Sequence, residues 1–300
     1  MNRVDRPTTK RFDRPVLSPS IPRVTVRGSQ RGTLPTVLVF CFSIWTFPLT
    51  AADKSVIVPL RQAHAHNDYL HARPLLDALD QGFGSVEADI LLKDGQLLIG
   101  HEAKDLQPSR TLESLYLQPL RDRVRAQDGG VYGKDFRFYL LIDVKTAAEE
   151  TYEVLDQTLR RYSDMLSVWR NDRFEPKAVT VILSGNRARE LIVKQTIRYV
   201  GIDGRPEDLD TDVTAHLVPW ISARWGQLFT WNGDGSFPAN EREKLVDLVS
   251  RAHKRGQQVR FWATPEKEAV WRELKNQQVD LINTDDLAGL RKFLLSQSSQ

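Results

Sequence analysis

Short runs rich in β-branched and aromatic residues alternate with longer segments of helical periodicity from about residue 55 onward. This alternation is typical of a parallel sheet whose strands are joined by covering helices. Eight runs fit strands: SVIVPL (55–60), SVEADI (85–90), FYLLIDV (138–144), AVTVILS (178–184), IRYVGI (197–202), LVPWIS (217–222), QVRFWA (258–263) and VDLINT (279–284). Eight strands with helices between them in about 250 residues predict an α/β fold, a (β/α)₈ TIM barrel.

The segments between these runs predict helices at 73–82, 111–127, 148–166, 240–256 and 266–278. The connection 203–216 is polar and lacks a clear helical pattern, so an open doubly wound sheet is the alternative architecture. No GxGxxG or Walker loop follows any of the runs, which weakens the nucleotide-binding versions of that alternative.

The N-terminal segment has the pattern of an export signal. The first 31 residues carry eight basic and two acidic side chains, and an uncharged stretch, TLPTVLVFCFSIWTFPLTAA, follows at 33–52. Small residues at its end predict cleavage near Ala52, which gives a signal peptide with a basic leader at 1–52, a barrel domain at 53–300, and a secreted or periplasmic location. The alternatives are an uncleaved membrane anchor and a basic leader lengthened by a misplaced start codon.

Removal of this leader changes the interpretation of the charge. The whole chain has a formal net charge of +3, and the leader's net +6 accounts for more than all of it, so the mature chain is left at about −3. The basic character is therefore not a nucleic-acid signature. Cys41, the single cysteine, lies within the leader, so we expect a domain that is stabilised by its core rather than by disulfides.

Polar side chains collect where the first three predicted strands end. The first run leads into His64, His66 and Asn67; the second ends with Glu87 and Asp89; the third ends with Asp143 and Lys145. Side chains two apart on a strand point the same way, so each pair should project into one space. A single pair of this kind is more often a capped loop or a surface ion pair. Two acidic pairs on neighbouring strands would repel one another unless a cation or a proton lay between them.

Three carboxylates without a nearby cysteine or histidine ligand pattern suit one divalent cation, Mg²⁺ or Ca²⁺, rather than zinc. Such an ion and Lys145 would form a positive pocket for an anion, most plausibly phosphate. His101 lies 14 residues after Glu87, and the turn Lys93-Asp94-Gly95 predicts a short return strand, LLIG (97–100), that brings it back beside the acids. Two histidines there would supply a proton acceptor and a proton donor.

At these residues the chain resembles the phosphatidylinositol-phospholipase-C-like phosphodiesterases, which include the glycerophosphodiester phosphodiesterases. The resemblance rests on His66, Glu87-Ala88-Asp89, His101 and Asp143-Val144-Lys145, and it continues into RFWATPE and VDLINTDD. Within that superfamily, HAHNDYLHARPLLDAL and ARWGQLFTWNGDG are most similar to the altered-inheritance-of-mitochondria protein group.

The resemblance implies a metal-dependent phosphoric diester hydrolase. It assigns general acid–base catalysis to His66 and His101, metal binding to Glu87, Asp89 and Asp143, and substrate binding to Asn67, Lys145 and Trp262. His64 is the alternative to His66, and Trp262 either stacks on substrate or closes the barrel mouth. The usual His-Arg-Gly is replaced by His66-Asn67-Asp68 and no Glu-Asn-Thr follows, so glycerophosphodiester specificity stays open because Asn67 cannot replace the arginine fork.

The predicted substrate is a small-molecule or lipid phosphodiester, attacked either by water or by a neighbouring hydroxyl of the substrate to give a cyclic phosphate. The alternative function is a catalytically inactive exported barrel that binds a phosphorylated lipid or sugar. A metal-free phospholipase is disfavoured, since it would have no use for three converging acids. Contact with a membrane surface is compatible with a lipid substrate, whereas oligomeric state has no signal in the sequence.

Overall fold

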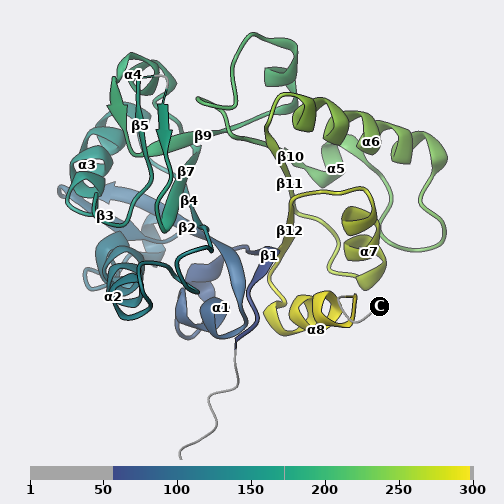
Figure 1. The fold of residues 1–300 in the computed structure, drawn as a ribbon, viewed down its shortest axis with the longest axis horizontal. Coiled ribbons are helices and arrows are strands. Elements are labelled where there is room, and N and C mark those ends of the chain that lie inside the picture. The colour runs from purple at the N-terminus through teal and green to yellow at the C-terminus, as the bar shows by residue number, and fades with distance from the viewer. Residues whose placement is uncertain (1–56, 172, 298–300) are drawn as a thin grey trace, which may run out of the picture. The chain divides into compact units, whose positions relative to one another are not determined.

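Eight parallel strands close into a barrel in the computed structural model, which describes residues 57–171 and 173–297 (Figure 1). Around the barrel the strands are, in order, β1 (Leu60–Ala65), β2 (Phe83–Lys93), β4 (Phe138–Val144), β7 (Val179–Gly185), β9 (Val200–Gly204), β10 (Trp220–Arg224), β11 (Gln258–Trp262) and β12 (Leu281–Thr284). The ring closes because β1 pairs in parallel with both β12 and β2. The predicted (β/α)₈ barrel is confirmed.

Helices cover the outside of this ring. They are α1 (Leu76–Asp80), α2 (Gln118–Ala126), α3 (Ala148–Arg160), α4 (Arg189–Lys194), α5 (Trp225–Leu228), α6 (Ala239–Lys254), α7 (Glu268–Asn276) and α8 (Leu287–Gln297). Four shorter turns accompany them: η1 (Asp68–Leu70), η2 (Ala103–Asp105), η3 (Glu113–Leu117) and η4 (Pro206–Asp210). Each longer helix buries one stripe, as α7 does with Val270, Trp271 and Leu274.

The predicted helices form, but several are shorter than their sequence pattern. The segment 73–82 is helical only at Leu76–Asp80, and 203–216 contains only η4, as its polar sequence indicated. The predicted return strand is confirmed as β3 (Gln96–Ile99), which pairs antiparallel with β2 through a turn at Asp94 and Gly95. Both turn residues have positive φ, which glycine adopts without cost.

Two predicted strands are placed differently. SVIVPL suggests a strand at 55–60, but β1 begins at Leu60 and continues through LRQAHA, directly after Pro59, whose missing N–H suits the position before a strand. The shift puts His64 inside the strand, where Ala63 pairs with Ile282. IRYVGI divides between β9 and β8 (Ile197–Arg198), which forms a second sheet with β5 (Val168–Arg170) and β6 (Arg173–Glu175).

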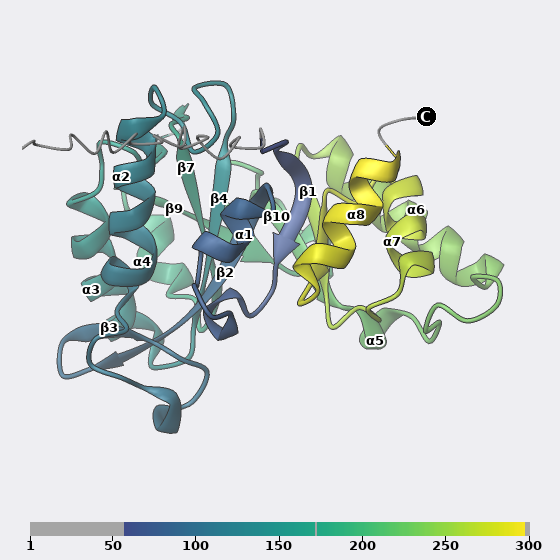
Figure 2. The ribbon, with the colours of Figure 1, turned by 90° about the horizontal axis from the view of Figure 1, so that it is seen from below.

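The barrel interior changes character along the strands. An apolar layer contains the buried side chains of Leu141, Ile182, Trp220 and Leu281. Inward-facing positions two residues further along these strands carry polar groups instead, such as Asp143 after Leu141 on β4. Figure 2 shows the β1 arrow pointing toward the edge at which β3 and α5 lie. The polar layer is therefore at the carboxyl ends of the strands, where barrel active sites form.

Within the described residues, no helix combines the length and the apolar character that crossing a membrane requires. The expected leader at 1–52 and its cleavage near Ala52 lie outside the described residues.

Candidate active site

A cavity of about 230 Å³ opens at the carboxyl ends of the strands. All eight side chains predicted from the sequence line it, namely His66, Asn67, Glu87, Asp89, His101, Asp143, Lys145 and Trp262. Four further residues complete the lining: Ser184, Gly185, Arg205 and Arg260. The strands thus bring residues from 66 to 262 into one space.

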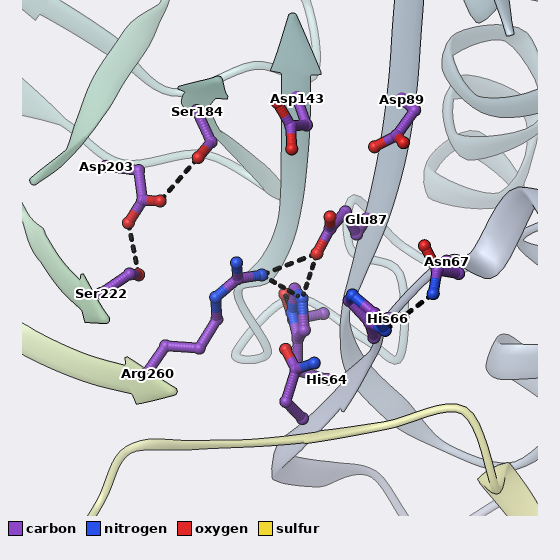
Figure 3. A network of polar contacts seen from close by, with 12 residues as sticks. His64, His66, Asn67, Glu87, Asp89, Asp143, Ser184, Asp203, Ser222 and Arg260 are labelled. Atoms are coloured by element: carbon purple, nitrogen blue, oxygen red, sulfur yellow. Dashed lines mark hydrogen bonds and ion pairs between the residues drawn. The ribbon is translucent and has the colours of Figure 1, made fainter. Parts of the chain in front are cut away.

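Two sides of this cavity differ in chemistry. The acidic wall comes from β2 and β4 and from the segments that follow β1, β3 and β4, and it consists of His66, Glu87, Asp89, His101, Asp143 and Lys145. The arginine wall comes from β7, β9, β11 and the loop after β9, and it consists of Ser184, Arg205, Arg260 and Trp262. Figure 3 shows Glu87 between Arg260 and the carboxylates of Asp89 and Asp143.

The three carboxylates of the acidic wall form a cluster with unsatisfied oxygens. One oxygen each of Glu87, Asp89 and Asp143 lies within 4.8 Å of the others. Glu87 Oε2 accepts from Arg260 Nη1 (2.7 Å), whereas Asp89 Oδ1 and Asp143 Oδ1 are buried without a partner among the described residues. Buried carboxylate oxygens without donors are costly unless a cation is present. The donor set, all oxygen, fits Mg²⁺ or Ca²⁺.

Lys145 neutralises part of this cluster. Its Nζ donates to Asp143 Oδ2 (2.8 Å) and lies 3.1 Å from Asp89 Oδ2. Burial alone would lower the pKa of Lys145, but the charges of the two aspartates raise it above the usual value. Burial raises the pKa of Asp143 despite the nearby ammonium. Lys145 is therefore positively charged at neutral pH, with one N–H left for a ligand.

Glu87 belongs to a buried network deeper in the barrel. Burial alone would raise its pKa, but the positive charge of Arg260 beside it holds the pKa far below the usual range. Arg260 keeps a raised pKa although it is buried, because Glu87 lies beside it. Both groups are consequently charged, and they form an ion pair with almost no exposure to water.

Gly185 gives Asp143 the room it needs. Its φ is +68°, and a Cβ at this position would overlap both Asp143 Oδ1 and the main-chain atoms of Val144. A side chain here would therefore displace the carboxylate and strain the backbone at the same time.

His66 follows β1 directly and is held by an acid that follows the last strand, β12. Its Nδ1 lies 2.9 Å from Asp285 Oδ1, and Asn67 Nδ2 donates to the same oxygen at 3.3 Å. Burial alone would lower the pKa of His66, but the hydrogen bond with Asp285 and the charge of Glu87 raise it. The Asn67 amide nitrogen also lies 2.9 Å from Nδ1, so Nδ1 is occupied by contacts within the protein. Nε2 is the nitrogen left for a ligand.

His101 reaches the same cavity from the strand that returns through β3. Its Nδ1 lies 2.8 Å from Asp89 Oδ2, which the hydroxyl of Tyr69 also approaches at 2.9 Å. The side chain is 58% exposed, so the ring is open to solvent. His66 and His101 are thus alike: each has Nδ1 tethered by a carboxylate and Nε2 free of any partner within the part of the chain that the structure describes.

His64 has a different environment. Its ring is completely buried, its Nδ1 lies 2.7 Å from Ser85 Oγ, and its Nε2 accepts from Arg260 Nη1 at 2.7 Å. Burial and the charge of Arg260 lower the pKa of His64 to about 4, so the ring is neutral at pH 7. It does not line the cavity. Of the two alternatives, His66 is the histidine that faces the site.

The other predicted residues take more specific places. Asn67 adopts a left-handed conformation (φ 47°), and its Oδ1 lies 3.1 Å from the Tyr69 hydroxyl, so its amide also braces the loop after β1. Trp262 ends β11 and is half-buried, with the guanidinium of Arg205 4.9 Å from its ring centroid.

Sequence reasoning missed the arginines and Asp285. Arg260 lies two residues before Trp262 on one strand, so strand alternation alone places both on the same face. Asp285 follows the last predicted strand in VDLINTDD, a position of the kind that delivers side chains to a barrel mouth. Arg205 lies in the polar segment after β9, where nothing in the sequence pattern marks it.

Comparison with known proteins identifies the relatives of this chain. The family model "AIM6-like phosphodiesterase domain" matches residues 53–203, and "Glycerophosphoryl diester phosphodiesterase family" matches 258–288. The "Altered inheritance of mitochondria protein 6" of Eremothecium gossypii is 32% identical over 270 residues, which cover 78% of this chain and 69% of that protein. A homolog from Arthroderma benhamiae is 28% identical over 280 residues, covering 83% of this chain and 88% of that protein.

Among solved structures, a glycerophosphodiester phosphodiesterase from Parabacteroides distasonis aligns with 80% of this chain and 98% of its own, at 15% identity and a TM-score of 0.49. The family model and the Eremothecium gossypii relative decide the assignment, since the first covers half of the chain and the second more than two thirds. This chain belongs to the AIM6-like phosphodiesterase domain family.

Proposed function

We propose that this protein is a divalent-cation-dependent phosphodiesterase that uses His66 and His101 as a general acid–base pair. One observation carries the proposal. Two imidazoles with tethered Nδ1 and free Nε2 face the same cavity as three carboxylates, two of which have buried oxygens without partners among the described residues. Imidazoles are suited to proton transfer near neutral pH, and carboxylate oxygens are suited to binding a hard divalent cation.

Glu87, Asp89 and Asp143 would hold one divalent cation, Mg²⁺ or Ca²⁺. When bound, the cation supplies positive charge that offsets the charge of the phosphate and of the attacking oxygen. The charges agree with a monoanionic ligand. Three carboxylates with Lys145 and Arg260 sum to −1, a divalent cation brings the site to +1, and a phosphodiester neutralises it.

The chain's own groups carry the proton transfers. One imidazole Nε2 takes the proton from the attacking hydroxyl or water as the new P–O bond forms. The other imidazole gives its proton to the alcohol oxygen as the old P–O bond breaks. Asp285 and Asp89 keep the two rings in place, and the remaining N–H of Lys145 donates to a nonbridging oxygen of the phosphate. Asn67 and Trp262 would contact the alcohol portions.

The attacking group is either water or a neighbouring hydroxyl of the substrate, and the latter gives a cyclic phosphate. We further propose that the leader directs export and that the substrate is a small-molecule or lipid phosphodiester met outside the cytoplasm. The supporting pattern is the basic, then uncharged, sequence at 1–52.

An activity screen tests the proposal directly. The purified protein is assayed on glycerophosphodiesters, lysophospholipids and cyclic phosphates with added Mg²⁺ or Ca²⁺, and with EDTA as control. We expect cation-dependent release of product, reduced about 100-fold or more in His66→Ala and in His101→Ala. His253→Ala is the matched control, because that histidine contacts Asp280 away from this cavity.

Full turnover in both histidine variants, or in EDTA, would contradict the mechanism. Tight binding of a phosphorylated ligand without turnover would instead identify the non-enzymatic alternative, an exported barrel that binds a phosphorylated lipid or sugar.

A further inference from the structure

The arginine wall holds more positive charge than its own acids neutralise. Arg205 Nη1 donates to Asp203 Oδ2 at 3.0 Å. The buried carboxylate of Asp203 also accepts from Ser184 at 2.7 Å and from Ser222 at 2.5 Å (Figure 3). Asp203 is therefore fully satisfied, and its role toward Arg205 is to fix the position of the guanidinium.

A second guanidinium lies beside the first. Arg187 Nη1 donates to the main-chain oxygen of Asp203, and Arg205 Nη1 lies 3.3 Å from that same oxygen. Burial and the charge of Arg205 both lower the pKa of Arg187. Three cations, Arg187, Arg189 and Arg205, lie near two carboxylates, those of Asp203 and Asp208, which leaves one surplus positive charge beside the cavity.

The donors of this pair are available to a ligand. Among the described residues, no acceptor is bonded to Nη2 of either Arg187 or Arg205, and Arg205 lines the cavity. By contrast, Arg260 is neutralised by Glu87, and the neighbouring Arg189 by Asp208. Arg205 therefore presents a free guanidinium edge to the cavity, whereas Arg187 contacts Asp203 without lining the cavity.

Trp262 is not free to bind a cation. The guanidinium carbons of Arg205 and Arg260 lie 4.9 Å and 6.0 Å from its ring centroid, so the protein's own arginines take the cation–π position. A quaternary ammonium group near this ring would meet two positive charges instead of an open aromatic face.

We propose that this site selects phosphodiesters in which the alcohol next to the arginine wall carries a negative charge, a carboxylate or a further phosphate, and that Arg205, backed by Arg187, binds that group. Phosphodiesters of choline are disfavoured for the same reason. The proposal rests on the phosphodiesterase function proposed above and names its substrate class.

Three glycerol phosphodiesters of similar size test this selection, with choline, glycerol or glycerate as the second alcohol. We expect kcat/KM to rise from choline to glycerol to glycerate, by about tenfold or more overall. Arg205→Gln should lower the glycerate-to-choline ratio by about tenfold, and Arg187→Gln should lower it less. Arg242→Gln is the matched control: it removes an equal charge from an ion pair with Glu273 whose residues do not line the cavity, so the ratio should not change.

The ratio within one variant cancels effects on folding and on the chemical step. Thermal unfolding of each variant identifies any that fail to fold, and Arg187→Gln, which gives up only a bond to a main-chain oxygen, then carries the test. Equal use of choline and glycerate by the wild type, or an unchanged ratio in the folded arginine variants, would overturn this inference while leaving the phosphodiesterase function intact. Failure to cleave any of the three, together with failure in the broader screen, would contradict the proposed function itself.

Discussion

The two walls of the cavity treat buried carboxylates in opposite ways. On the acidic wall, Asp89 and Asp143 each keep one buried oxygen without a partner among the described residues. Behind the arginine wall, both oxygens of Asp203 are bonded, to Ser184, Ser222 and Arg205. An incomplete set of partners indicates a place for a ligand, whereas a complete set indicates a support. The acidic wall therefore has free oxygens that a cation could bind, whereas the carboxylate behind the arginine wall is used to position the guanidinium of Arg205.

The largest effect is expected where the two walls meet, at the buried pair of Glu87 and Arg260. Glu87→Gln or Arg260→Met alone leaves one buried charge uncompensated, and each should lower the free energy of unfolding by about 3–5 kcal/mol. The double variant should lose clearly less than the sum of the two. Urea unfolding in the presence of EDTA measures this, so that no cation contributes to the result.

An exposed ion pair provides the reference for that cycle. Arg73 pairs with Asp77 and Asp80 at the surface, and Arg73→Met should cost far less than either variant of the buried pair. Strictly additive losses for Glu87 and Arg260 would mean that the two side chains do not stabilise one another.

A second test compares Asp203 with Asp68, a buried acid in the loop that carries His66. Asp68 accepts from the N–H of Leu75 (2.6 Å) and the hydroxyl of Tyr116 (2.9 Å) but has no cationic partner among the described residues. Burial raises the pKa of Asp68 to about 7. The native state then binds a proton that the unfolded state has lost, so stability should fall as pH rises from about 4 to about 7, by up to roughly 4 kcal/mol.

Asp68→Asn should remove most of this decline, because the amide oxygen still accepts both hydrogen bonds and carries no charge. Asp203→Asn should instead lower stability at every pH, since Arg205 loses its counterion. Urea unfolding at pH 4.5, 6 and 8 distinguishes the two. Parallel curves for the wild type and Asp68→Asn would show that Asp68 does not titrate in this range.

The acidic wall could be predicted from the sequence because its information is local. Strand alternation fixes the common face of Glu87 and Asp89, and it does the same for Asp143 and Lys145. A two-residue turn then brings His101 back to them. The fold could also be predicted from the sequence, because eight strand-like runs with helices between them are compatible with few closed arrangements.

The arginine wall depends on pairings that no local pattern encodes. Arg260 pairs with Glu87, which lies 173 positions earlier in the chain. Closure of the barrel brings their strands, β11 and β2, close to each other, with β12 and β1 between them. The place of Arg260 on the same face as Trp262 could be read from the sequence, but its partner could not. The start of β1 was misplaced because β-branched content favoured SVIVPL, whereas pairing with β12 selected LRQAHA.

Substitutions at Gly185 and Gly95 distinguish the cost of backbone strain from the cost of crowding against Asp143. Both glycines have positive φ, but a Cβ at Gly95 meets nothing within 4 Å, whereas one at Gly185 overlaps Asp143 and Val144. Gly95→Ala should cost about 1–2 kcal/mol of stability from the backbone alone. Gly185→Ala should cost a further 1–3 kcal/mol or so and weaken cation binding, because Asp143 must move. Urea unfolding and calorimetric titration with Mg²⁺ or Ca²⁺ measure the two effects, and equal costs with unchanged cation affinity would show that Asp143 does not depend on this glycine.

The smallest effect is expected at Asp285, which follows the last strand and tethers the ring of His66, a proposed acid–base residue, without contacting the three carboxylates of the acidic wall. Asp285→Asn keeps the shape but removes the carboxylate that can accept the Nδ1 proton of His66, and it leaves two amides beside Nδ1, which favours the wrong tautomer. We expect kcat to fall about 10- to 100-fold, with little change in cation affinity or stability. Asp286→Asn is the matched control, because its carboxylate accepts from the N–H of Gly289 and does not contact His66. A similar loss in both variants would mean that negative charge at this edge matters rather than the tether, and the symmetry between His66 on Asp285 and His101 on Asp89 would then have no catalytic meaning.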